Sequence, residues 1–91
     1  MKQILLSKLK SATVFNVDRL TIYSWLRKGC PVVDSGGPGK PAQLDFQAVL
    51  QWRLEDLESM GIEEGSRALA ATQARQRLKV LKKGDRHGTR H

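Results

Sequence analysis

A short helix with a strong start and a strong stop is the feature that most constrains this chain. Asp18 is a favourable N-cap, because its carboxylate can accept hydrogen bonds from the free amides of the first helical turn. Gly29 is a favourable stop, because glycine readily takes the left-handed conformation that ends helices. Between them, Ile22, Trp25 and Leu26 fall on one face at helical spacing. We therefore expect a helix from Asp18 to Gly29 that is anchored by this apolar face.

The outward face of this helix carries cationic and hydrogen-bonding side chains, which suit a polyanionic partner. We interpret it as the recognition helix of a DNA-binding helix-turn-helix, in which arginine can bond guanine and other side chains contact phosphates. Tyr23 could contact DNA from this face, or it could instead pack on the segment that follows the helix. Together with one lysine further along the chain, the candidate DNA-binding residues are Arg19, Thr21, Tyr23, Ser24, Arg27, Lys28 and Lys40.

A second helix is predicted ahead of the first, from Ile4 to Phe15, with Ser7 as a plausible N-cap. Its lysines are expected to neutralise phosphates of the DNA. Two short helices joined by a turn at Asn16 and Val17 are the helix-turn-helix layout, although many small helical domains contain such a pair. The expected core comprises Leu9, Ala12, Val14, Phe15, Val17, Ile22 and Trp25.

The segment after Gly29 predicts a β-hairpin, which is where the wing of a winged helix lies. Residues 30–33 read as an extended strand, residues 34–41 as a turn-rich loop with Lys40 near its tip, and residues 43–45 as a returning strand. Such a glycine-rich tip could approach a phosphate backbone closely. The alternative is a flexible surface hairpin without a ligand.

The same loop has some likeness to a phosphate-binding P-loop, but the spacing is wrong. That motif needs glycine where this chain has Asp34, and serine or threonine where it has Pro41. We therefore predict no nucleotide site and no cofactor.

Two further helices are predicted in the second half of the chain. Asp45 should cap a helix from Phe46 to Met60, and Ser66 should cap another from Arg67 to Lys83. Residues 1–60 would thus form the winged helix-turn-helix, and residues 61–91 a basic helix and tail. The fold class expected is mostly α with a small β-hairpin, followed by a C-terminal helix. The apolar positions of that last helix have coiled-coil spacing and are Ala71, Ala74, Leu78 and Leu81.

This apolar stripe of the last helix leaves two alternatives open. It can pair with its twin in a homodimer or higher oligomer, or it can pack back on the domain. We favour pairing, because the other faces of the helix are too polar to be buried.

Charge is distributed in three blocks. Residues 1–40 carry seven basic side chains against two acidic ones, residues 41–66 carry one against six, and residues 67–91 carry eight against one, for a net charge of +7. These blocks suggest that different faces have different partners, although solvated surfaces would show the same pattern. A lone cysteine and the lack of an apolar run long enough to span a bilayer predict a soluble intracellular protein with no membrane partner.

The residues needed for catalysis are missing. The two histidines, His87 and His91, both lie in the basic tail, and Cys30 has no histidine before it in the chain to activate it. A metal site on the histidines lacks a third ligand at suitable spacing, so a solvated tail is expected instead. We predict a binding module and not an enzyme.

Several of these residues together resemble the N-terminal domain of the small terminase subunit of lambda-like phages. The resemblance covers roughly the first 55 residues. It is carried by VFNVDRLTIYSWLRKGCPVVDSGGPGKPAQLDFQAVLQW, in which the shared pattern includes Thr21-Ile22, Trp25, Gly29, Pro31-Val32, the glycine-rich loop, Asp45, Ala48-Val49 and Trp52. The segment SRALAATQARQRLKVLKKG is also similar to the helix that supports self-association in that family.

The resemblance implies a winged helix-turn-helix dimer that recognises a packaging site on viral DNA in the host cytoplasm. It would present this DNA to a large terminase subunit, which carries the enzymatic activities. The reading helix would be Asp18 to Lys28 and the wing Val33 to Leu44. Leu20 departs from the pattern on the exposed face, and the chain is shorter than the family usually is. A winged-helix transcriptional regulator or an excisionase-type accessory factor is the alternative, and a protein-interaction adaptor a third.

Overall fold

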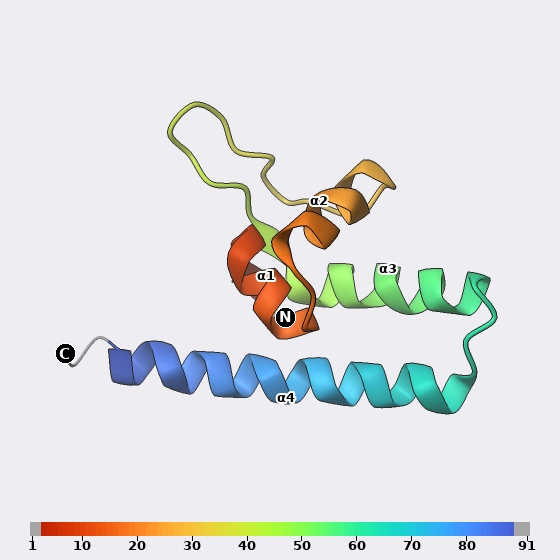
Figure 1. The fold of residues 1–91 in the computed structure, drawn as a ribbon. Helices are drawn as coiled ribbons and strands as arrows, with labels where there is room; N and C mark the ends of the chain where they lie inside the picture. The colour runs from red at the N-terminus through yellow and green to blue at the C-terminus, as the bar shows by residue number, and fades with distance from the viewer. Residues whose placement is uncertain (1–2, 89–91) are drawn as a thin grey trace.

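The computed structural model describes residues 3–88, with side chains described up to Lys82. Within this part of the chain the protein is mostly helical, with one small antiparallel sheet. Figure 1 shows α3 and α4 side by side, α1 against them, and α2 with a long loop on the far side from α4. The elements are β1 (Leu5–Leu6), α1 (Lys8–Phe15), α2 (Arg19–Arg27), β2 (Leu44–Asp45), α3 (Phe46–Ser59) and α4 (Glu64–Gly88).

The predicted caps of the first helices are confirmed. The Ser7 hydroxyl oxygen accepts a hydrogen bond from the amide of Lys10 at 3.1 Å, and Asp18 Oδ1 accepts one from the amide of Thr21 at 2.9 Å. Asn16 ends α1 in the left-handed region, at φ 56°. These local signals position α2 directly after α1.

The prediction that helix begins at Ile4 is wrong. Residues Leu5 and Leu6 form β1, which pairs with β2 so that Leu6 lies opposite Leu44. Ile4 continues this pairing, because its amide donates to Asp45 Oδ1 at 3.2 Å and its carbonyl accepts from the amide of Phe46 at 2.8 Å. The extended form buries Leu6 and Leu44 together.

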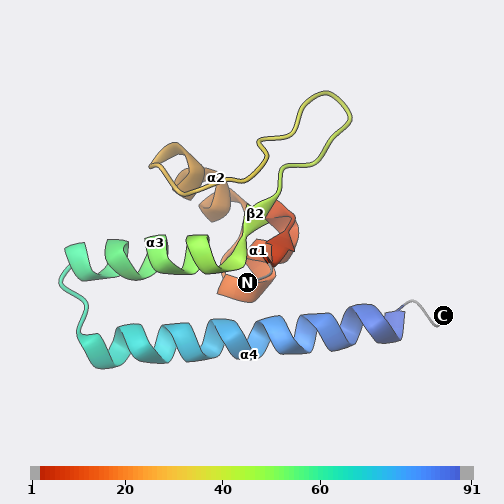
Figure 2. The same ribbon diagram turned by 180° about the vertical axis from the view of Figure 1, so that it is seen from behind.

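The predicted hairpin after α2 is present only in part. Residues 30–33 are not a strand, and the two arms of the loop meet through isolated bridges between Asp34 and Gln43 and between Gly37 and Lys40. The returning strand, β2, takes β1 as its partner instead. The long loop between α2 and β2 therefore projects from the rest of the protein (Figures 1 and 2).

The core has two adjoining clusters. One gathers around Ile22 and Trp25, which are 0% and 4% exposed, and the other around Val14 and Phe46. Phe15 packs against both clusters. Leu9 was expected in the core and is 64% exposed, because the buried face of α1 is centred on Ser11, which lies on the opposite side of the helix from Leu9.

Helix α4 packs back on the domain. Ala71, Ala74 and Leu78 are buried in the same cluster as Val14 and Phe46, and Leu81 packs against it. The stripe we expected to pair with a second copy is thus covered by the protein's own core. Of the two alternatives for this stripe, the structure shows the one in which it packs back on the domain.

The bounds of α4 also differ from those expected. The helix begins at Glu64, before Ser66, and continues to Gly88 instead of ending at Lys83. Residues 89–91, including His91, and the side chain of His87 lie outside the described part of the protein. No helix in the described part is long and apolar enough to cross a membrane.

Candidate nucleic-acid interface

An open groove of about 500 Å³ lies between three segments that carry predicted site residues. Its walls come from the first turn of α1 (residues 7–9), from the first half of α2 and from loop residues 35–42. We call it the α1–α2–loop groove. Figure 2 shows the loop rising beside these two helices.

Three cations from three different segments line this groove: Lys8, Arg19 and Lys40. None of them forms an ion pair with a described residue. Among the described residues no carboxylate lines the groove, and the side chain of Asp34, in the same loop, accepts a hydrogen bond from the amide of Gly36 at 2.9 Å. A concave surface with unpaired cations and no acidic lining suits phosphate oxygens.

Tyr23 joins two of these walls. The Lys8 ammonium lies over its ring, 4.7 Å from the ring centroid. The contact brings α1 into the site. The lysines of this first helix were expected to neutralise phosphates, and Lys8 lines the groove.

A tight turn shapes the tip of the loop. The amide of Lys40 donates to the carbonyl of Gly37 at 2.9 Å, with Pro38 second in the turn and Gly39 third at φ 81°, as in a type II turn. No helix follows this turn, so the P-loop remains excluded. The geometry places Lys40 at the groove wall.

Gly36 is the position where this loop requires glycine. Its φ is 80°, and a Cβ added there would lie 2.5 Å from the carbonyl oxygen of Lys40. Any other residue would push the two arms of the loop apart.

The seven predicted DNA-binding residues do not all converge. Arg19, Tyr23 and Lys40 line the α1–α2–loop groove. Arg27 follows Arg19 and Tyr23 at steps of four along one stripe of α2, so it extends the surface beyond the groove. The other three, Thr21, Ser24 and Lys28, do not line the groove.

Thr21 has a structural role. Its hydroxyl donates to Asp18 Oδ1 at 2.6 Å, which commits it to the helix cap. The hydrogen bond from this hydroxyl lowers the pKa of the Asp18 carboxyl, and the hydrogen bond from the amide of Thr21 lowers it further. Lys28, exposed, is the C-cap of α2, and Ser24 is half-buried.

Cys30 is buried beneath the loop. Desolvation raises the pKa of its thiol to about 11, so it stays protonated and unreactive near neutral pH. Among the described residues, no group of three or more acidic, histidine or cysteine side chains could hold a metal ion.

Comparison with known proteins gives no family assignment. Neither the known protein families, nor the curated proteins, nor the solved structures contain a match to this chain.

Proposed function

We propose that this chain binds double-stranded DNA through α2 and the loop that follows it, as the small, DNA-recognising subunit of a phage-type terminase. The observation that carries the DNA proposal is the convergence of Lys8, Arg19 and Lys40 on one groove with no acidic lining. The terminase assignment comes from the sequence resemblance.

In this proposal α2 enters the major groove with its outer stripe foremost. Arg19 and Arg27 stand at opposite ends of that stripe, and an arginine there can make paired hydrogen bonds to guanine. The loop tip, with Lys40, would contact the phosphate backbone as the wing does in a winged helix. Trp25 anchors the helix from behind.

The proposed role is to recognise a packaging site and to present the DNA to a large terminase subunit in the host cytoplasm. The chain itself is not an enzyme in this proposal. It would act as a homodimer or higher oligomer, and the copies would meet through surfaces other than the covered stripe of α4.

Duplex binding with matched charge variants tests the DNA proposal. The salt dependence of affinity for a duplex selected from a random library would be measured for Arg19→Ala, Lys40→Ala and Arg75→Ala. Arg75 is exposed on α4, outside the groove, so it controls for the loss of one charge. We expect the first two to reduce the slope of log affinity against log salt by about 1 each, and the third to leave it unchanged.

Equal effects of all three variants, or no duplex binding, would contradict the proposal. Arg27→Ala adds a test of base reading. A loss of about 1–3 kcal/mol confined to the selected sequence would assign it to a base, and an equal loss on every sequence would assign it to phosphate.

Footprints separate the proposed role from its alternative. Protection at the ends of phage genomes supports packaging. Protection at promoters or attachment sites would instead support a winged-helix transcriptional regulator or an excisionase-type accessory factor.

A further inference from the structure

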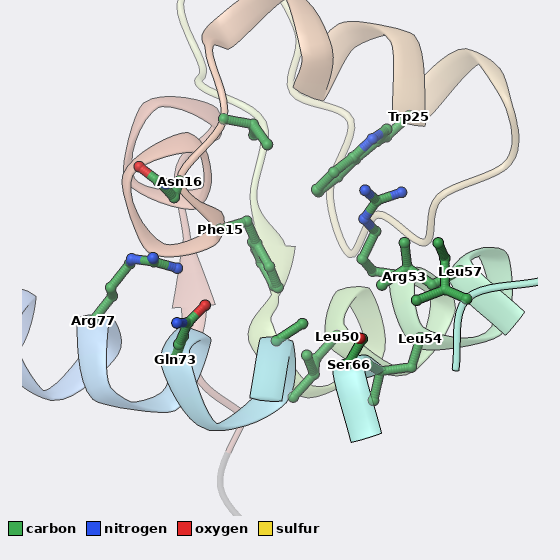
Figure 3. A pocket seen from close by; sticks show the side chains of 13 residues that line it. Phe15, Asn16, Trp25, Leu50, Arg53, Leu54, Leu57, Ser66, Gln73 and Arg77 are labelled. Carbon is green, nitrogen blue, oxygen red and sulfur yellow. The ribbon is translucent and has the colours of Figure 1, made fainter. Parts of the chain in front are cut away.

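A second groove, of about 320 Å³, lies between α4 and the turn from α1 to α2, with α3 beneath it (Figure 3). Its apolar surface includes Phe15, Leu50 and Leu54, and its polar groups include Arg53 and Arg77. We call it the α3–α4 groove. It shares no lining residue with the α1–α2–loop groove.

The α3–α4 groove follows α4 for about three turns. Helix α4 lines it with Ser66, Ala70, Gln73 and Arg77, at steps of four, three and four along one face. The eleven steps from Ser66 to Arg77 span about 16 Å, since each residue rises about 1.5 Å. That length matches about five residues of extended chain, at roughly 3.3 Å per residue.

Two arginines supply its charge. Arg53 forms an ion pair with Asp56 at 3.0 Å, and its guanidinium lies 4.9 Å from the centre of the Trp25 ring. Arg77 is half-buried and has no ion-pair partner among the described residues. Figure 3 shows them on opposite sides of Phe15.

Both guanidiniums have donors to spare. The Arg53 bond to Asp56 uses Nη1 alone, and arginine has five N–H donors in all. Between the two arginines, the side-chain amide of Gln73 can bond the backbone of an extended chain. A carboxylate is therefore accommodated at each end, with an apolar side chain between them.

We propose that the α3–α4 groove binds an extended segment of a partner protein in which an apolar residue is flanked by acidic residues. The apolar side chain packs on Phe15, Leu50 and Leu54, and the carboxylates pair with Arg53 and Arg77. Because the two grooves are separate, this segment and a polyanion on the other face bind together. The proposal does not depend on the identity of the ligand at the α1–α2–loop groove.

Synthetic peptides test this directly with the full chain. The probes are fluorescent seven-residue peptides with a central leucine or phenylalanine flanked by glutamates, read by anisotropy. Matched sets replace the glutamates by glutamines or the central residue by serine. We expect the first set to bind and each replacement to weaken binding by about tenfold.

Charge variants of α4 locate the site. Arg77→Glu and Gln73→Glu should each weaken the glutamate peptides by about tenfold, and Gln73 is exposed, so its replacement leaves the core intact. Arg75→Glu, the same change two residues away, lies outside this groove and should alter binding less than about twofold. Circular dichroism would confirm that each variant is folded.

Three results would overturn the proposal: no binding of the glutamate peptides up to about 1 mM, equal binding of the glutamine peptides, or equal effects of Arg75→Glu and Arg77→Glu. Duplex affinity measured on the same variants keeps the two proposals apart. The peptide proposal can fail while the duplex still binds, and the duplex proposal can fail while the peptides still bind.

Discussion

The ammonium group of Lys8, in the first turn of α1, lies over the ring of Tyr23 in the middle of α2, 4.7 Å from the ring centroid. Both side chains are partly exposed, and a contact of this kind stabilises by about 0.5–1 kcal/mol. It brings Lys8 against Tyr23, one of the predicted DNA contacts. It also means that α1 contributes a cation to the surface of α2.

Replacing Lys8 by methionine should weaken duplex binding by about three- to tenfold and reduce the salt slope by about 1, because one phosphate contact is lost. The melting temperature should change little. Lys79→Met, at an exposed position on α4, removes the same charge away from the groove and should leave the slope unchanged. An unaltered slope in Lys8→Met would mean that Lys8 only packs on Tyr23.

The loop tip offers a matched pair of glycines. Gly36→Ala would place a Cβ against the backbone at φ 80°, whereas Gly37 has open space around it. We expect Gly36→Ala to cost about 1–2 kcal/mol of local strain and to weaken duplex binding, with Gly37→Ala near the wild type. Anisotropy titrations on one duplex would measure both. Equal affinities would show that the shape of the loop does not matter for binding.

Features of the fold that depend on neighbours in sequence were predictable. The caps Ser7, Asp18 and Asp45 and the buried pair Ile22 and Trp25 are read from residues within one or two helical turns. Arg19, Tyr23 and Lys40 could be named as candidates for the same reason, since exposure and charge follow helix phase and turn chemistry.

Features that depend on distant partners were not predictable. Leu6 pairs with Leu44 across almost half the chain, and nothing near Leu6 distinguishes an extended start from a helical one. The stripe at Ala74 and Leu78 has the spacing of a coiled coil whether it meets a second copy or its own domain. The lysines of the first helix were expected to contact phosphates, but the place of Lys8 beside Tyr23 depends on how α1 crosses α2.

The carboxylate of Asp45 links the N-terminal segment of the chain to the start of α3. One carboxylate oxygen accepts from the amide of Ala48 at 3.3 Å, as an N-cap does, and the other accepts from the amide of Ile4 at 3.2 Å. Asp45→Ala should therefore destabilise by about 2 kcal/mol, more than the roughly 1 kcal/mol expected for the cap alone. Urea unfolding would measure the difference, with Ser7→Ala as the cap-only reference. Equal losses would show that the bond to Ile4 adds nothing.

Burial of Cys30 predicts a pH dependence of stability. Desolvation raises the pKa of its thiol from 9.0 to about 11 in the folded state. Below pH 9 the thiol is protonated whether folded or unfolded, so it contributes no dependence. Between pH 9 and 11 only the unfolded state ionises, so stability falls as pH rises, by about 2–3 kcal/mol in all.

Urea unfolding across this pH range, compared between wild type and Cys30→Ala, isolates the contribution of the thiol. All other residues are common to the two proteins, so their contributions cancel in the difference. The stability of the variant should fall less steeply above pH 9. Parallel curves would show that the thiol is hydrated in the folded protein.

The apolar stripe of α4 gives the sharpest test of how the chain is assembled. Leu78 is 6% exposed within the core and Val80 is 69% exposed two residues later. Leu78→Ala should cost about 2–4 kcal/mol and Val80→Ala close to nothing, at any protein concentration. Truncation after Gly65 should unfold the remainder, because it uncovers Val14, Phe46 and Leu50.

A dimer held by this stripe would behave differently. Its unfolding midpoint would rise with protein concentration, and Leu78→Ala would shift the molar mass in light scattering without removing the folded monomer. Unfolding of the wild type and of Leu78→Ala at two concentrations about a hundredfold apart distinguishes the cases. Loss of a dimer contact at this stripe would make the difference in stability between the two proteins depend on concentration. We expect the same difference at both concentrations, because the side chains of this stripe already pack against α1 and α3 of the same chain.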